Sequence, residues 1–198
     1  MSDPRHLLVW TIDDTVGFDS AWVRIDGSRL SAEGRATGLS PMPFWTTYRL
    51  ETGDDFVTAR VEVQSRWDGG AATLDLRNED GRWSVNGEPR PDLEGALDCD
   101  LGACPLTNTM PVLRRGLLGG PADLTFLMAF IEIPTLHVVP SRQRYTHVRA
   151  TDDGGAIVKY RSDNFESDLT FDAEGFVVVY PQLGHRLETT PRPRQRAT

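Results

Sequence analysis

The chain has 198 residues and a formal net charge of −8 at pH 7. This length allows one sizeable hydrophobic core, and a hydrophobic fraction of 39% is far from the composition of a disordered chain. The last eight residues carry three arginines and no acidic side chain, so the rest of the chain is more acidic than the total. Because such a surface repels phosphate backbones, we expect no nucleic-acid partner.

The cysteine content and the lengths of the apolar runs exclude several other classes of protein. Only two cysteines are present, Cys99 and Cys104, which is too few for a zinc site or for a disulfide framework. The apolar run at residues 7–10 is too short for a signal peptide, and the longest run, residues 126–131, is far shorter than a membrane span. We therefore expect a cytoplasmic protein with no cofactor, no metal site and no transmembrane segment, while its oligomeric state stays open.

Apolar and polar residues alternate with a period of two in several segments, which predicts strands with one buried and one exposed face. The clearest cases are residues 57–64, 73–77, 82–85 and 168–172. Pairs of an acidic or Asn residue with Gly lie between such runs, at residues 26–27, 80–81, 86–87, 153–155 and 174–175. These pairs are typical of hairpin turns, so the sequence predicts a mostly β fold built as an antiparallel meander.

Helix signals are few. The best candidate is residues 109–116, with Thr109 as the N-cap and Gly116 as the stop signal. We expect this helix to be short.

Two parts of the chain follow the same succession of elements. The segments that begin at Tyr48 and at Tyr145 each read strand, acidic turn, strand, connection, strand, acidic-Gly turn and strand, and they start 97 residues apart. A duplicated β-meander explains this pattern. The alternative is that any antiparallel sheet shows such self-similarity.

The duplication predicts one β domain over residues 1–190. Its halves would be about 1–95 and 96–190, and they would meet near residues 91–101. The remaining residues, 191–198, are expected to form a flexible basic tail.

Residues 124–133 are apolar at both strand faces. Phe126 and Met128 lie on one face, and Leu127 and Ala129 lie on the other. Such a segment is either a central strand covered by a second layer or a strand with one face along an apolar cavity.

The densest group of polar side chains lies at residues 97–115, LDCDLGACPLTNTMPVLRR. Asp98 and Asp100 are two residues apart, so in an extended segment both point to the same side. Paired carboxylates serve as acid and base in sugar chemistry. The structural alternative is a brace in which Arg114 and Arg115 neutralise the two aspartates. The sequence contains no standard nucleophile, metalloprotease or phosphate-binding motif.

This same segment resembles the signature of a bacterial family known as "Putative glycolipid-binding". The family shows D-x-D-L, then P-x-T-N-T-x-P, then an arginine pair, and later a Q-x-Y-T element and a strand–turn–strand unit that ends in Y-P. The resemblance covers roughly residues 9–187. It implies a curled antiparallel sheet, a half-barrel similar to those of lipoprotein-localisation carriers, whose apolar concave side could hold an acyl chain.

Three functional hypotheses follow. The first is non-catalytic binding of a lipid or glycolipid in an apolar half-barrel cavity with a polar rim. The second is a hydrolase that acts on a sugar or lipid ester with Asp98 and Asp100, and the third is a structural or partner-binding protein without a small ligand. The candidate ligand-binding residues are Asp98, Asp100, Thr107, Asn108, Arg114, Arg115, Phe126, Met128, Gln143, Tyr145, Tyr160 and Tyr180.

Overall fold

The structure is a computed structural model that describes residues 5–188, so the predicted tail at 191–198 lies outside the described residues. The first half of the chain forms β1 (Arg5–Ile12), β2 (Gly17–Asp26), β3 (Arg29–Gly38), β4 (Phe44–Thr52), β5 (Thr58–Trp67), β6 (Gly70–Glu79), β7 (Arg82–Val85) and β8 (Glu88–Pro89). The second half forms β9 (Asp98–Leu101), β10 (Asp123–Ile131), β11 (Val138–Ala150), β12 (Ala156–Ser162), β13 (Phe165–Phe171), β14 (Val177–Tyr180) and β15 (Gly184–Arg186).

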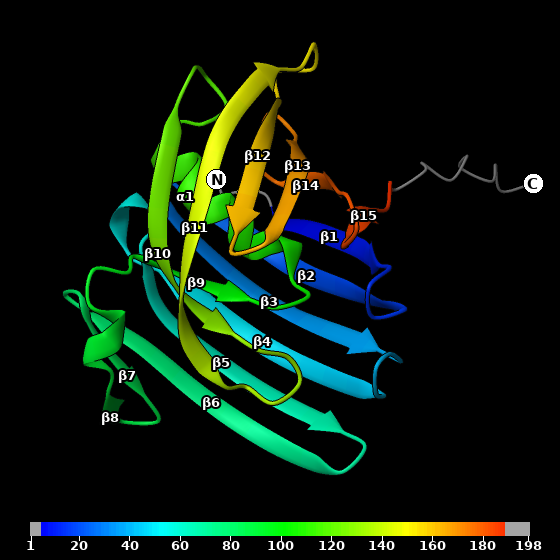
Figure 1. Ribbon diagram of the computed structural model, residues 1–198, viewed down its shortest axis with the longest axis vertical. Coiled ribbons are helices and arrows are strands. Elements are labelled where there is room, and N and C mark those ends of the chain that lie inside the picture. Colours follow the sequence, from blue (N-terminus) through cyan, green and yellow to red (C-terminus); the bar gives the residue numbers. More distant parts are fainter. Residues whose placement is uncertain (1–4, 189–198) are drawn as a thin grey trace, which may run out of the picture.

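All 15 strands belong to one curled sheet that does not close into a barrel (Figure 1). Neighbours in the chain pair with each other, except that β8 and β9 form the two edges of the sheet, and β1 pairs with β15 to join the two halves. The mostly β, curled antiparallel fold predicted from the sequence is confirmed. One pair differs, because β9 and β10 run parallel. Parallel neighbours need a crossover connection, and the segment between these strands supplies it.

The proposed duplication stays a prediction. β4–β7 and β11–β14 are both sequential antiparallel meanders, as the repeated pattern requires. A sequential order is common to every meander, however, so the shared order does not distinguish a duplicated unit from an ordinary sheet.

The segment between β9 and β10, residues 102–122, lies inside the curl and is called the plug here (Figure 1). It contains a 3₁₀ turn at Pro105–Asn108 and the helix α1 at Thr109–Arg114, and Gly116 ends the helix with a φ of 61°. The predicted short helix is therefore present. Its N-cap position is taken by Asn108, not Thr109, and the Thr109 hydroxyl is buried without a hydrogen-bond partner.

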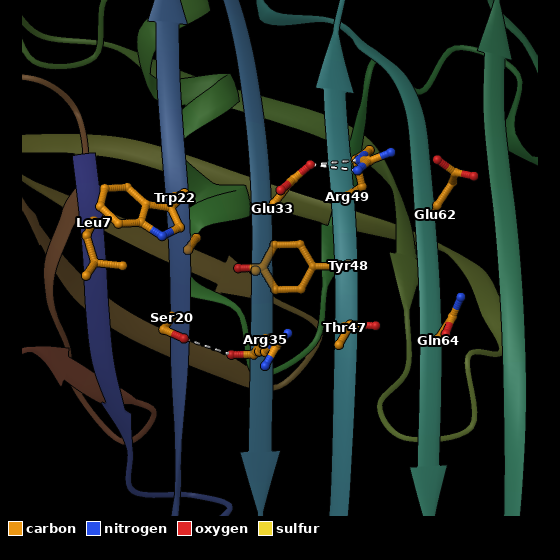
Figure 2. Close-up of a pocket in the computed structure, with 12 residues that line it drawn as sticks. Leu7, Ser20, Trp22, Glu33, Arg35, Thr47, Tyr48, Arg49, Glu62 and Gln64 are labelled. Carbon is orange, nitrogen blue, oxygen red and sulfur yellow. Dashed lines mark hydrogen bonds and ion pairs between the residues drawn. The ribbon is translucent and has the colours of Figure 1, made fainter. Parts of the chain in front are cut away.

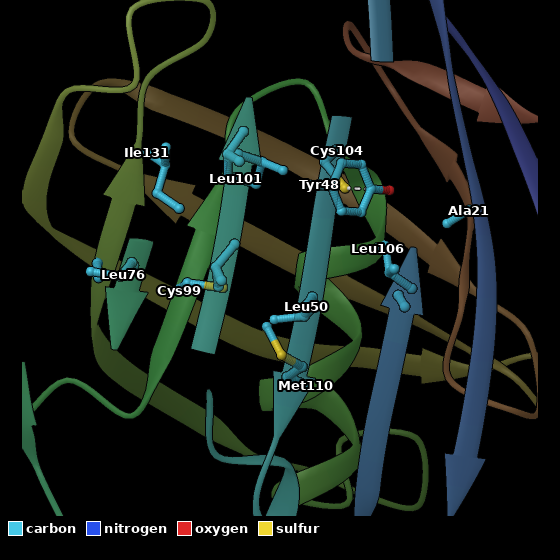
Figure 3. Packing of buried hydrophobic residues seen from close by; sticks show 14 of the residues in the cluster. Ala21, Tyr48, Leu50, Leu76, Cys99, Leu101, Cys104, Leu106, Met110 and Ile131 are labelled. Carbon is cyan, nitrogen blue, oxygen red and sulfur yellow. Dashed lines mark hydrogen bonds between the residues drawn. The ribbon is translucent and has the colours of Figure 1, made fainter. Parts of the chain in front are cut away.

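The plug divides the core into two clusters. Leu106 and Met110 pack against the concave face of the first half (Figure 3), and Val112 and Leu117 pack against the concave face of the second half. The remaining short elements are 3₁₀ turns at Asp54–Phe56 and Pro91–Leu93. Within residues 5–188, no helix is long and apolar enough to cross a membrane.

β10 is covered on both faces. Ala129 and Ile131 belong to the first core cluster, while Met128 belongs to the second. The first half covers the back of the β9 edge, where the Thr58 hydroxyl accepts a 3.0 Å hydrogen bond from the backbone N–H of Cys99. Most of the apolar run at residues 124–133 is thus covered, as the first of its two interpretations predicts, while the half-buried Phe130 near its end borders a cavity, as the second predicts.

Candidate functional site: a groove on the concave face of the second half

A buried ion pair joins the plug to β9. The guanidinium of Arg114 donates two hydrogen bonds of 2.5 Å, one to each carboxylate oxygen of Asp98. The Asp98 side chain is fully buried and that of Arg114 is 6% exposed. Burial raises the pKa of Asp98, and the hydrogen bonds and charge of Arg114 oppose that rise. Both oxygens of Asp98 are occupied by one cation, which is the geometry of a structural brace.

Only one arginine of the pair takes part. Successive residues of a helix point about 100° apart, so Arg114 and Arg115 cannot both face Asp98. Arg115 is exposed. Its positive charge acts on Asp98, but its side chain takes no part in the hydrogen bonds of the brace that the sequence predicted for both arginines. Phe126 packs beneath the bound guanidinium, 5.6 Å from its ring centroid to the Arg114 carbon.

Asp100 lies on the same concave face and has no cation among its hydrogen-bond donors. Gln143 on β11 donates from Nε2 to one oxygen at 2.6 Å, and the Thr107 hydroxyl of the plug donates to the other at 2.9 Å. Burial raises the pKa of Asp100, the two hydrogen bonds lower it, and the charge of Asp98 raises it further. Asp100 therefore holds the amide of Gln143 in one orientation.

Tyr145 ties this network to the plug. Its hydroxyl is 2.9 Å from Oδ1 of Asn108 and 3.2 Å from Oε1 of Gln143, and it can donate to either oxygen. The amide of Asn108 in turn donates to the carbonyl of Pro105. The network thus crosses from β9 through the plug to β11 without leaving the interior.

A groove of about 590 Å³ opens beside this network at the end of the concave face. Three aromatic rings form one wall, with centroid separations of 5.9 to 6.2 Å: Tyr160, Phe165 and Tyr180. Phe130 lies at the opposite side, and Gln143 reaches the groove from the polar network. Aromatic walls with a few convergent polar groups are typical of small-molecule sites of this size.

The predicted residues divide into three groups. Gln143, Tyr160 and Tyr180 line the groove. Behind them lie the members of the polar network: Asp98, Asp100, Thr107, Asn108, Arg114 and Tyr145. Met128 is only 1% exposed and packs in the second core cluster, next to the half-buried Phe126.

Sequence reasoning missed Phe130 and Phe165 as groove residues. Phe130 continues the alternation of Phe126 and Met128 on the concave face of β10, and this signal could have identified it. Phe165 follows the β12–β13 turn, and only the pairing of β12 with β13 places it in the wall. No group of three or more His, Cys, Asp or Glu side chains in residues 5–188 is arranged to hold a metal ion.

A second groove, of about 630 Å³, lies on the opposite, outer face of the sheet over β1–β5 (Figure 2). Leu7 and Trp22 lie at one side of it, Glu62 and Gln64 lie at the other, and between them Glu33 forms an ion pair of 2.6 Å with Arg49. Its lining is charged and contains none of the candidate residues. This outer groove suits a polar ligand better than an acyl chain, because the apolar part of an amphiphile would displace paired charges there.

A further buried carboxyl lies in the first half. Asp19 is fully buried, and its carboxyl oxygens accept from the Tyr48 hydroxyl at 3.1 and 3.3 Å. Burial raises the pKa of Asp19 to about 7, although hydrogen bonds from the Cys104 thiol, the Tyr48 hydroxyl and the backbone N–H of Ser20 oppose the rise. This carboxyl is sealed from solvent in the first core cluster and lines neither groove.

The sequence matches the family described as "Putative glycolipid-binding" over residues 7–186. The chain belongs to this family. The crystal structure of a DUF1089 family protein from Pseudomonas aeruginosa is similar, with a TM-score of 0.70 and 28% identity over 85% of this chain and 92% of that one. A β-barrel-like protein of the DUF1849 domain from Brucella abortus shares the fold alone, with a TM-score of 0.54 and 8% identity over 94% and 95% of the two chains. No curated protein matches the sequence.

Proposed function

We propose that this member of the family binds a lipid or glycolipid in the groove of the second half and does not turn it over. One observation carries the proposal: an aromatic-walled groove opens directly over a buried polar network, in which Asp100 holds the Gln143 amide at the edge of the groove. The apolar part of the ligand would lie along Phe130, Tyr160 and Phe165. Its polar part would meet the half-buried serine hydroxyls at Ser141 and Ser162, in front of Gln143.

The energetics support an acyl chain as the apolar part. Each buried methylene contributes roughly 0.8 kcal/mol, so about ten of them offset the lower range of association costs. The hydroxyls of Ser141 and Ser162 add to this, because a hydrogen bond of 3.2 Å between them orders both side chains before the ligand arrives. Preorganisation of this kind lowers the entropy cost of binding.

The cytoplasmic location belongs to the same proposal. Cys99 and Cys104 are buried and free, which agrees with a reducing compartment. An amphiphilic small molecule is the partner we propose, and the acidic net charge argues against nucleic acid.

Titration with a fluorescent fatty-acyl probe tests the proposal. We expect saturable binding by the wild-type protein and its loss in Phe165→Asp, because this change places a charge in the groove wall. Phe165 is 40% exposed, so the variant should still fold. The matched control is Trp22→Asp, which changes an aromatic residue of similar exposure, 48%, in the outer groove. Equal loss in both variants, or no binding by the wild type, would contradict the proposal.

The hydrolase hypothesis is tested on the same samples. Asp98 is held by Arg114, so Asp100 is the carboxyl better placed to act as an acid, because its pKa is raised next to the groove. We expect no product from a panel of esters and glycosides. Steady turnover that disappears in Asp100→Asn would replace the binding proposal with an enzyme.

A further inference from the structure

Exposed apolar side chains gather at one end of the sheet. We call this end the rim and define it by the turns at residues 13–16, 39–43, 68–69, 163–164 and 181–183. Ten large hydrophobic side chains are exposed in residues 5–188, and six of them lie in these turns or within two residues of them: Val16, Phe18, Leu39, Trp45, Phe165 and Val179. The asymmetry between the two ends of the sheet therefore needs an explanation.

Backbone hydrogen bonds connect the rim turns to one another. Asp13 donates to the carbonyl of Leu183 at 2.7 Å, and Leu39 donates to that of Thr15 at 2.8 Å. Asp68 donates to the carbonyl of Pro43 at 3.1 Å, which extends the series to the β5–β6 turn. The β1–β2, β3–β4 and β5–β6 turns lie together at the right of Figure 1. The β1–β2, β3–β4, β5–β6 and β14–β15 turns thus form one connected edge, in or next to which most of these apolar side chains lie.

The groove opens at this same edge. Phe165 begins β13 directly after the turn at 163–164, and Tyr180 ends β14 directly before the turn at 181–183. Leu183 donates to the carbonyl of Tyr180 at 3.0 Å, so the groove wall and the rim are joined by the backbone. A ligand that crosses the rim would enter the groove without passing the charged outer face.

Val16, in the rim, has a backbone conformation that is unfavourable for valine. Its φ is 51°, a left-handed conformation that costs energy for a β-branched residue and that Gly or Asn would adopt easily. Its side chain is 60% exposed, so burial does not compensate this cost. Beside it, a hollow of about 510 Å³ is lined by Phe18, Leu39 and Trp45.

We propose that the rim docks on a lipid bilayer whose headgroups carry no net charge, and that the groove exchanges its ligand there. This inference rests on the proposed function. Tryptophan beside aliphatic side chains is typical of the membrane–water interface. The exposed carboxylates of Asp13, Asp14 and Asp68 flank the apolar residues, and the chain is acidic overall, so an anionic bilayer would repel the rim. The same carboxylates would face each other if two copies of the chain met at their rims.

Flotation with phosphatidylcholine vesicles tests this docking. We expect the wild-type protein to float with the vesicles, and less so when anionic phosphatidylserine is added. The variant Val16→Asn/Leu39→Glu should lose at least about tenfold in vesicle partitioning, because two exposed apolar side chains no longer enter the interface. Asn suits the backbone at position 16, so this variant should fold. The control is Leu7→Glu/Val148→Glu, two residues that are 45% and 47% exposed and lie away from the rim.

The fatty-acyl probe, used in solution without vesicles, separates the two proposals. If the rim variant binds the probe normally but no longer floats, both proposals are supported. If the wild type floats but never binds the probe, the rim docks and the groove function is wrong. Equal flotation of the rim variant, the control and the wild type would overturn the docking. So would a wild-type dimer in sedimentation velocity that only the rim variant dissociates, because a second copy would then be the partner.

Discussion

The two halves of the sheet use their concave faces differently. In the first half, the plug side chains Leu106 and Met110 fill the curl, and Asp19, the one buried carboxyl among the described residues of that half, is fully buried. In the second half, the plug adds a polar network beside its apolar side chains Val112 and Leu117, and none of its residues lines the groove at the rim end. Both halves are antiparallel meanders, so the difference comes from what the plug covers. The position of one short segment decides where the concave face is filled and where it remains open to a ligand.

The largest expected effect comes from the brace between the plug and the second half. Asp98→Ala leaves the buried guanidinium of Arg114 without a partner, so we expect a loss of about 3–5 kcal/mol in the free energy of unfolding. Urea denaturation measures it. Asp54→Ala removes a similar bidentate pair with Arg29 on the surface, and this control should cost far less, because solvent screens an exposed ion pair. Equal losses in the two variants would show that the brace does not hold the plug.

The second prediction concerns the sealed carboxyl of the first half. The pKa of Asp19 is about 7 in the folded protein against an ordinary value of 3.8, so the folded state binds more protons than the unfolded state between these pH values. The stability due to this group is therefore present below about pH 4 and lost as the pH rises to about 7. The loss is on the order of 4 kcal/mol.

Asp19→Asn should remove this loss. We expect the variant to be more stable than the wild type at pH 8, and the difference between them to shrink toward pH 4. Denaturation curves at a series of pH values measure the difference. A constant difference from pH 4 to 8 would mean that Asp19 does not change its protonation on unfolding.

The third prediction separates the filled half from the open half. Phe165→Ala should weaken acyl-probe binding by about tenfold and change stability little, because its side chain borders the groove. Leu106→Ala should do the reverse, with a loss of about 2–5 kcal/mol in stability and normal probe binding by the folded fraction. If the two variants behave alike, core and groove are not distinct regions.

The smallest expected effect concerns the link between the plug and β11. Tyr145→Phe removes only the hydroxyl that bonds Asn108 and approaches Gln143, so we expect a loss of about 1 kcal/mol in stability. Probe binding should weaken by a few-fold at most, because Asp100 still holds the Gln143 amide. An unchanged melting temperature would show that water replaces the hydroxyl.

The strands and their turns could be predicted from local sequence. Residues 57–64 alternate and form most of β5, and the Asp80-Gly81 pair lies in the β6–β7 turn, as predicted. The pairing of β1 with β15 and the parallel pairing of β9 with β10 could not be predicted. Alternation shows which face of a strand is buried, but the choice of partner depends on contacts between residues far apart in the chain.

The candidate site was also only partly predictable, because some of its features follow from local sequence and others depend on contacts between distant residues. The spacing of Asp98 and Asp100 places both on one face, and the resemblance adds Gln143 and Tyr160. The division of roles between the two aspartates was not predictable, because it depends on which arginine the helix turns inward. The groove itself lies in the space that the plug does not fill, and the position of that space cannot be predicted from a local sequence pattern.

Photo-crosslinking tests the central claim most directly. A fatty-acyl probe that carries a diazirine on its chain is bound, activated by light and located by peptide mass spectrometry. We predict labels at residues 130–132, 139–141 and 160–165, which line the groove of the second half. The labels should disappear in Phe165→Asp and persist in Trp22→Asp. Labels confined to residues 20–35 and 47–64 of the outer face would contradict the account and assign the ligand to the other groove.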